Sequence, residues 1–152
     1  MKRNAIMILA LSALSAATLA GGGLRLEVGN PEANAEARAM NAALVARVTS
    51  CHEPGKSKVT ASYLRFEGGE VRRTQLEVAQ LRSPGTFAIL GAVPEGSVID
   101  LGVTNPQFEH YEPRLLLRSA SHGVQWGSIR HFASKPPTDS DVKTILAQAP
   151  DK

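Results

Sequence analysis

The densest group of residues that could do chemistry is the short stretch Cys51-His52-Glu53. A thiolate and an imidazole side by side can donate sulfur and nitrogen to zinc or copper, which accept both ligand types. Structural zinc sites, however, usually repeat their ligands as C-x₂₋₄-C or H-x₃₋₅-H, and Cys51 is the only cysteine. We therefore keep three interpretations open: a buried, inert thiol, a metal site at Cys51 and His52, and a thiol that is redox-active or pairs with another molecule.

The remaining histidines are His110, His122 and His131. His110 stands between Glu109 and Glu112, but nothing in the sequence brings these imidazoles to the cysteine. We expect them to be exposed loop residues without a specific role.

Nucleophilic catalysis needs a serine or cysteine beside a base and an orienting acid. The sequence has no G-x-S-x-G motif, because Ser97 and Ser128 each have only one flanking glycine. The acidic residues form no recognisable pair for acid–base work, Asp100 included, and no phosphate-binding glycine loop is present. The sequence predicts a protein that is not an enzyme and needs no cofactor, with a hydrolase or thiol enzyme as the weakest alternative.

Four aromatic residues gather toward the C-terminus: Phe108, Tyr111, Trp126 and Phe132. An exposed aromatic platform could bind sugar or peptide. Aromatic residues make up only 5% of the chain, so a domain of this size needs most of them for its core. We expect these four side chains to be buried.

Residues 1–20 have the pattern of a cleavable secretory signal. Lys2 and Arg3 precede an uncharged apolar run, residues 5–19, and small residues allow cleavage before Gly21. The run is shorter than the about 20 apolar residues that a membrane span requires. We expect a periplasmic or secreted protein of bacterial type, with no membrane span after signal cleavage.

Residues 21–152 then form one domain of ordinary size. Without Lys2 and Arg3, 15 basic residues stand against 14 acidic ones, so the net charge falls to about +1 with histidines neutral. The basic residues are scattered and build no clustered face. Nucleic acid is therefore excluded as the expected partner.

Alternating apolar and polar residues between Gly and Pro turn signals predict seven or eight short strands. They cover residues 24–28, 44–49, 58–66, 71–81, 86–90, 97–104, 114–118 and 124–130. Residues 32–43 fit a short helix or an extended loop. A C-terminal helix is predicted over residues 138–149, capped by Thr138 or Asp139, with an apolar stripe at Val142, Ile145 and Leu146.

Residues 43–101 carry a strand, an SCHEP turn, a Gly-Gly hairpin, and the segments LEVAQL, SPGTFAI and PEG. This succession resembles the immunoglobulin-like or transthyretin-like sandwich modules of exported bacterial proteins. The resemblance implies an all-β sandwich with a binding or structural role and supplies no catalytic residue. The inter-sheet cysteine pair of antibody-type domains is absent.

Together these features predict an exported, non-enzymatic domain that docks to another protein or to an envelope component. The edge strands of its sheets would provide the docking sites, since their unpaired backbone groups accept an added strand. The alternative from another functional class is a periplasmic copper- or zinc-binding protein that uses Cys51 and His52.

Overall fold

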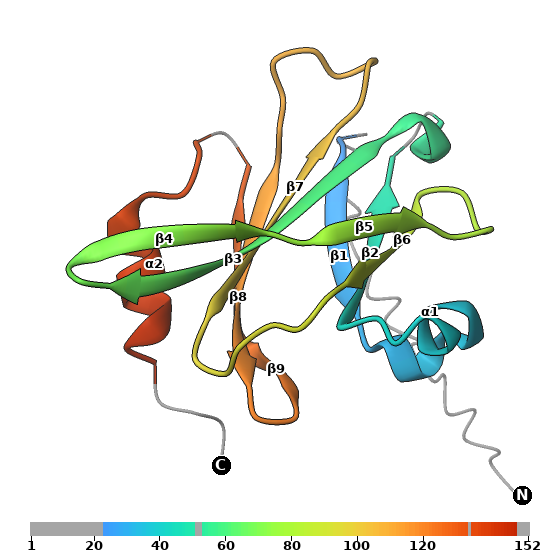
Figure 1. The fold of residues 1–152 in the computed structure, drawn as a ribbon. Coiled ribbons are helices and arrows are strands. Elements are labelled where there is room, and N and C mark those ends of the chain that lie inside the picture. Colours follow the sequence, from blue (N-terminus) through green and yellow to red (C-terminus); the bar gives the residue numbers. More distant parts are fainter. Residues whose placement is uncertain (1–22, 51–52, 134, 149–152) are drawn as a thin grey trace, which may run out of the picture.

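The computed structural model describes residues 23–50, 53–133 and 135–148, and within these ranges nine strands form two antiparallel sheets that face each other (Figure 1). One sheet has four strands in the order β1-β2-β6-β5, and the other has five in the order β4-β3-β7-β8-β9. The strands are β1 (Arg25–Gly29), β2 (Leu44–Thr49), β3 (Lys58–Glu67), β4 (Glu70–Gln75), β5 (Glu77–Gln80), β6 (Thr86–Leu90), β7 (Val98–Thr104), β8 (Arg114–Ala120) and β9 (Gly123–Phe132). The predicted all-β sandwich is confirmed.

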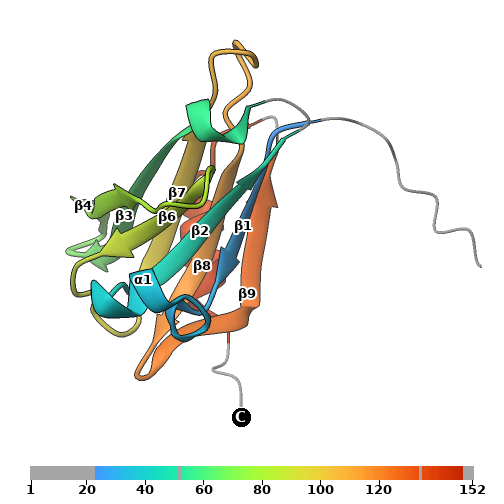
Figure 2. The ribbon, with the colours of Figure 1, turned by 90° about the vertical axis from the view of Figure 1, so that its right-hand side faces the viewer.

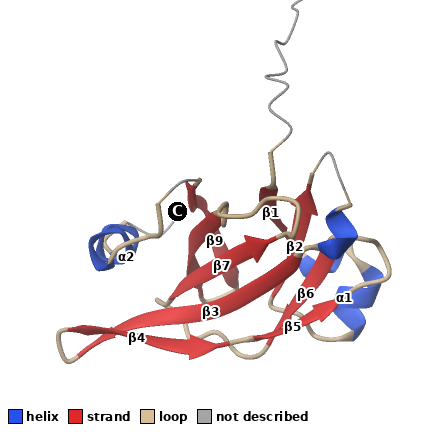
Figure 3. Ribbon diagram, turned by 90° about the horizontal axis from the view of Figure 1, so that it is seen from above, coloured by secondary structure: helices blue, strands red, loops and turns tan. Residues whose placement is uncertain are grey.

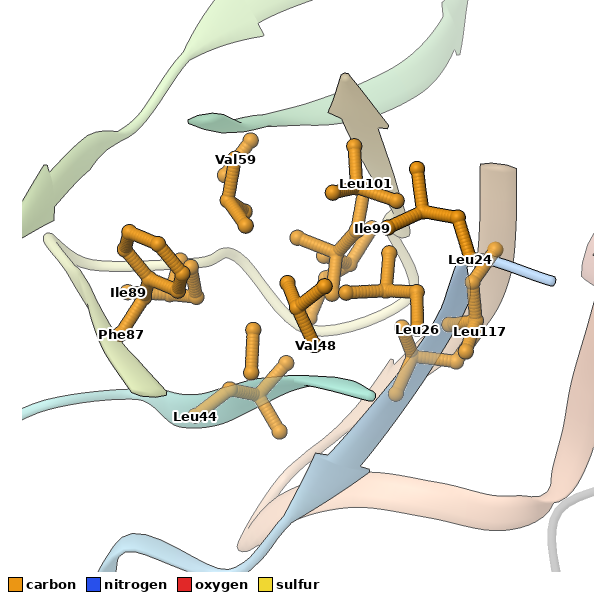
Figure 4. Close-up of a cluster of buried hydrophobic side chains, with 14 residues drawn as sticks. Leu24, Leu26, Leu44, Val48, Val59, Phe87, Ile89, Ile99, Leu101 and Leu117 are labelled. Atoms are coloured by element: carbon orange, nitrogen blue, oxygen red, sulfur yellow. The ribbon is translucent and has the colours of Figure 1, made fainter. Parts of the chain in front are cut away.

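The core lies between the sheets and is made of aliphatic side chains from both, with Phe87 as its buried aromatic residue (Figure 4). Most strands contribute alternate residues to it because successive side chains point to opposite faces. On β7, for example, Ile99, Leu101 and Val103 point inward. The alternation read from the sequence is thus the pattern that separates the core from the outer faces.

One predicted strand, residues 71–81, is two strands that belong to different sheets. β4 pairs with β3, whereas β5 pairs with β6. The chain crosses between the sheets at Leu76, which packs against the core and donates its N–H to the carbonyl of Ala61 (2.9 Å). This crossing links the two sheets along one side of the sandwich (Figure 1).

For the segment 32–43 the sequence allows either a short helix or a loop. The structure has a 3₁₀ turn (Pro31–Ala33) and the short helix α1 (Ala35–Ala39) there. The Asn34 side chain caps α1 by accepting from the N–H groups of Glu36 and Ala37, both at 3.0 Å. Ala37 is fully buried against the four-stranded sheet. A second 3₁₀ turn, Pro54–Lys56, lies between β2 and β3.

The predicted C-terminal helix is α2 (Asp139–Leu146). Thr138 caps it, as one of the two expected candidates, and Asp141 completes a capping box by accepting from the Thr138 N–H (2.7 Å). Val142 and Ile145 bury themselves on the outer face of the five-stranded sheet, where they meet Leu64, Val98 and Leu116. Figures 1 and 3 show α2 at the same end of that sheet as the β3–β4 hairpin.

α2 therefore covers only part of the outer face of the five-stranded sheet. Neither helix in the described part of the chain is long and apolar enough to cross a membrane.

Candidate functional site

A carboxylate is buried beside the part of the outer face that α2 covers. Ile99, Leu101 and Val103 of β7 fill the core, so Asp100 and Gly102 face the opposite side of the sheet. The Asp100 side chain is 0% exposed. A buried charge is costly unless it is paired and hydrogen-bonded, so its partners define this region.

Two arginines compensate Asp100, one from the neighbouring strand β8 and one from β4, which lies on the far side of β3. Arg114 on β8 donates from Nε to Oδ1 (3.0 Å) and from Nη2 to Oδ2 (2.8 Å). Arg73 on β4 donates from Nη1 to Oδ2 (2.7 Å) and also to the hydroxyl of Ser62 on β3 (2.6 Å). Asp100 thus accepts three charge-assisted bonds and fixes the position of both guanidinium groups.

Gly102 makes room for the Arg114 side chain. A Cβ at this position would lie 2.9 Å from Thr60 Oγ1, 3.0 Å from Arg114 Nη1 and 3.2 Å from Glu112 Oε1. These distances are shorter than ordinary contacts, so a side chain here would force the Thr60 hydroxyl and the ends of the Arg114 and Glu112 side chains to shift. The glycine after Asp100-Leu101 is therefore part of the ionic cluster, although it carries no charge.

A second carboxylate contacts the cluster from its solvent side. Glu112 Oε1 accepts from Arg114 Nη1 (3.0 Å) and the Glu112 side chain is half exposed. Burial lowers the pKa of Arg114, but hydrogen bonds and charges from Asp100 and Glu112 outweigh it and raise the pKa above its ordinary value. Arg114 therefore stays positively charged at any pH at which the protein is folded.

The cluster forms the floor of a groove of about 440 Å³. The groove is lined by Thr60, Ala61, Ser62, Arg73, Gln75, Glu112, Arg114, Pro136 and Pro137. A smaller hollow continues from it, shares Glu112, Arg114 and Pro136, and adds His110 and Lys135. The segment that leads into α2 thus supplies one wall of the groove.

A different hollow, of about 420 Å³, lies between the end strands of the two sheets. β1 ends one sheet and β9 ends the other, and they run side by side in opposite directions (Figure 2). We call this the β1–β9 seam. It is lined by Leu24, Arg25, Leu26, Glu27, Tyr111, Pro113, Arg114, His131, Phe132 and Ala133. The sheets are linked at the β4–β5 crossing, but no strand-to-strand pairing joins β1 to β9 among the described strands.

Backbone groups of β1 point into this seam. Val48 of β2 donates its N–H toward β6, to the carbonyl of Gly85 (2.7 Å). Leu26 faces Val48 in the antiparallel register. In an antiparallel pair, two directly opposed residues either both point their N–H and C=O groups toward each other or both point them away. Those of Val48 point away from β1, so those of Leu26 point away from β2, to the free edge of β1. The backbone groups of Val28, two residues on, point the same way.

The residues predicted as a metal site, Cys51 and His52, lie outside the described residues, and that prediction stays untested. The other three histidines are exposed, as expected, although His131 is on β9 and not in a loop. His110 has a left-handed backbone (φ 66°). Within the described ranges, no three His, Cys, Asp or Glu side chains come together in a way that could hold a metal ion.

The prediction that the C-terminal aromatic residues are buried is wrong for Trp126, whose side chain is 43% exposed. The other three, Phe108, Tyr111 and Phe132, are partly buried against apolar clusters. Trp126 is exposed because β9 bulges: the register with β8 shifts between Leu116 and Arg118. Ser128 holds the bulge by accepting from the Arg118 N–H (2.7 Å) and donating to the carbonyl of Gln125 (2.6 Å).

Sequence reasoning missed the Asp100 cluster. The signal was present, because Val98 to Val103 is apolar on both faces except at Asp100, and a strand buried on both faces must pair any charge that it contains. The identity of the partners was not readable, since Arg73 and Arg114 lie 27 and 14 residues away in the sequence.

No protein-family model matches this chain, and comparisons with curated proteins and with solved structures found no similar protein.

Proposed function

We propose that the protein is an exported, non-enzymatic binding domain that accepts an extended segment of a partner polypeptide along the β1–β9 seam. The observation that carries this proposal is the open seam itself, where two end strands lie side by side without pairing and leave an apolar hollow between them.

The seam offers both components of strand addition. The backbone N–H and C=O groups of Leu26 and Val28 supply main-chain hydrogen bonds, which give affinity in this recognition mode. Leu24, Tyr111 and Phe132 line the hollow and can take alternate apolar side chains, which give specificity. The occupant is therefore an extended segment with apolar residues at every second position.

Two further features favour an exported partner. The resemblance to exported sandwich modules implies a binding or structural role, and residues 1–20 have the pattern of a secretory signal. Export is part of this proposal, since residues 1–22 lie outside the described part of the chain. Sequencing the N-terminus of the protein after cell fractionation tests export and cleavage. We expect protein in the periplasm or medium that begins at Gly21. Recovery of the protein in the cytoplasm with an intact Met1 would contradict export, and an intact Met1 in the membrane fraction would contradict cleavage.

A displayed library of random ten-residue peptides, matching β9 in length, tests docking. We expect selection on the protein to enrich peptides with alternating apolar residues. Val28→Pro removes one N–H from the free edge of β1 without breaking the pairing of β1 to β2. It should weaken the binding of a selected peptide by about fivefold to tenfold.

The matched control is Gln80→Pro on β5, the other end strand of the same sheet. Leu81 donates to Thr86 on the β6 side, so the N–H of Gln80 also points to a free edge. This variant should bind the peptide as the unaltered protein does. Failure to enrich any alternating peptide, or equal weakening by both prolines, would contradict the proposal.

A further inference from the structure

The groove over Asp100 has polar groups whose bonding capacity the fold does not use. Arg73 donates through Nη1 to Asp100 and Ser62. Its Nε and Nη2 groups donate to no acceptor among the described residues, and its side chain is 45% exposed. These two nitrogens form the planar fork that matches a carboxylate in bidentate fashion.

The fold does not need an ionic cluster at this position. A buried ion pair contributes little net stability compared with apolar residues of similar volume. On the neighbouring part of the same face, the apolar side chains of Leu64, Val98 and Leu116 cover the sheet under α2 instead of charged residues. Covering this part of the sheet therefore does not by itself require charged residues.

Asp100 prepares Arg73 to bind. A free arginine side chain loses much conformational entropy when a ligand orders it, and that loss reduces affinity. Here the bonds of Nη1 to Asp100 and Ser62 order the guanidinium before any ligand arrives. The Arg73 fork is therefore a preorganised site on the groove floor.

The charges of the groove select a ligand with one negative charge. Arg73, Arg114 and Lys135 carry three positive charges, whereas Asp100 and Glu112 carry two negative ones. One positive charge remains uncompensated. A monoanion balances it, while a dianion such as phosphate would be repelled by the resident carboxylates.

We propose that this groove binds the carboxylate of a small ligand, with the Arg73 fork as its recognition group. Its volume of about 440 Å³ is in the range of small-molecule sites. Thr60 and Gln75 provide neutral hydrogen-bonding groups, and Pro136 and Pro137 an apolar wall. An acidic sugar and an acidic amino acid both present the required carboxylate. This site is separate from peptide docking at the β1–β9 seam, and the two share only Arg114 as a lining residue.

Titration of the ¹⁵N-labelled protein with glucuronate and with N-acetylglutamate α-amide tests the proposal and separates the two ligand sources. We expect saturable chemical-shift changes at amides of β3 and β4 and at the amide of Lys135 with at least one of them. Glucose, which lacks the carboxylate, should produce none. Changes with neither acid, or tighter binding of inorganic phosphate than of either acid, would overturn the proposal.

Three variants locate the site. Arg73→Gln leaves Arg114 on Asp100 and should weaken binding about tenfold or more. Arg72→Gln makes the same charge change on the adjacent residue, which points to the other face of β4, and should leave affinity unchanged. Glu112→Gln removes a competing carboxylate and should tighten binding by about twofold to fivefold.

Glu112→Gln keeps the test valid even if Arg73→Gln is unstable, because its expected effect is tighter binding. Weaker binding by Glu112→Gln, or equal loss in Arg72→Gln and Arg73→Gln, would overturn the proposal. Because the readout is small-ligand binding at β3 and β4, its failure would leave the seam proposal standing, and the reverse also holds.

Discussion

At the scale of single residues, Asp100 controls the ionic groove because three N–H groups from two arginines converge on it. Replacing it with an apolar residue leaves Arg114, only 18% exposed, without its main partner. We expect Asp100→Leu to lower the free energy of unfolding by about 3 kcal/mol, measured by denaturant titration.

The double variant Asp100→Leu/Arg114→Met is the control, since it removes both buried charges. It should recover a large part of the lost stability. If the double variant is as unstable as Asp100→Leu alone, the loss comes from packing and not from the stranded charge.

Gly102 belongs to the same cluster, because its missing side chain leaves room for Arg114. We expect Gly102→Ala to displace the guanidinium and to destabilise the protein by about 1–2 kcal/mol, measured by thermal unfolding. Gly29→Ala on β1, where no atom lies within 4 Å of the added Cβ, should change stability far less. Equal effects of the two substitutions would mean that the steric argument is wrong.

At the scale of elements, the position of α2 depends on its N-terminal cap. Thr138 and Asp141 exchange hydrogen bonds in a capping box. Thr138→Ala should destabilise the protein by about 1 kcal/mol, measured by thermal unfolding. Thr144, whose hydroxyl bonds only to the Ser140 carbonyl within the helix, offers the control Thr144→Ala, which should cost much less.

The same cap makes α2 sensitive to acid. Hydrogen bonds from the Thr138 hydroxyl and N–H lower the pKa of Asp141. A lowered carboxyl pKa stabilises the fold above the ordinary value of about 4, and this contribution is lost as pH falls through the folded value. We expect the protection factors of α2 amides, which correct for the intrinsic slowing of exchange in acid, to fall below pH 4, and Asp141→Asn to reduce that pH dependence. An unchanged pH dependence in this variant would contradict the role of the cap.

Element positions were largely predictable because turn residues and period-2 alternation are local properties. The break at Leu76 was not, since Val71 to Leu81 keeps a strand-like composition while its hydrogen-bonding partner changes from β3 to β6. The exposure of Trp126 depends on a bulge held by Ser128. Gly127 inside the strand indicates a bulge, but it does not show which side chain the bulge turns outward. The Asp100 cluster joins three distant segments, so sequence shows the buried charge but not its partners.

At the scale of the whole molecule, the binding and metal hypotheses make opposite predictions. We expect residues 21–152 to bind neither copper nor zinc with stoichiometric affinity, and Cys51→Ala to behave identically in a metal titration with chelator competition. One tightly bound metal ion per chain that Cys51→Ala or His52→Ala abolishes would contradict this expectation and support the metal alternative.

We propose above that the open β1–β9 seam receives an added strand. Amide hydrogen exchange of the protein, with and without a peptide selected on it, tests this docking, because an added strand pairs with backbone N–H groups that face the seam. We predict slower exchange at Leu26 and Val28 on β1 and at seam-facing amides of β9, with no change on β5. Protection confined to other parts of the molecule, or none at β1 and β9, would contradict the account.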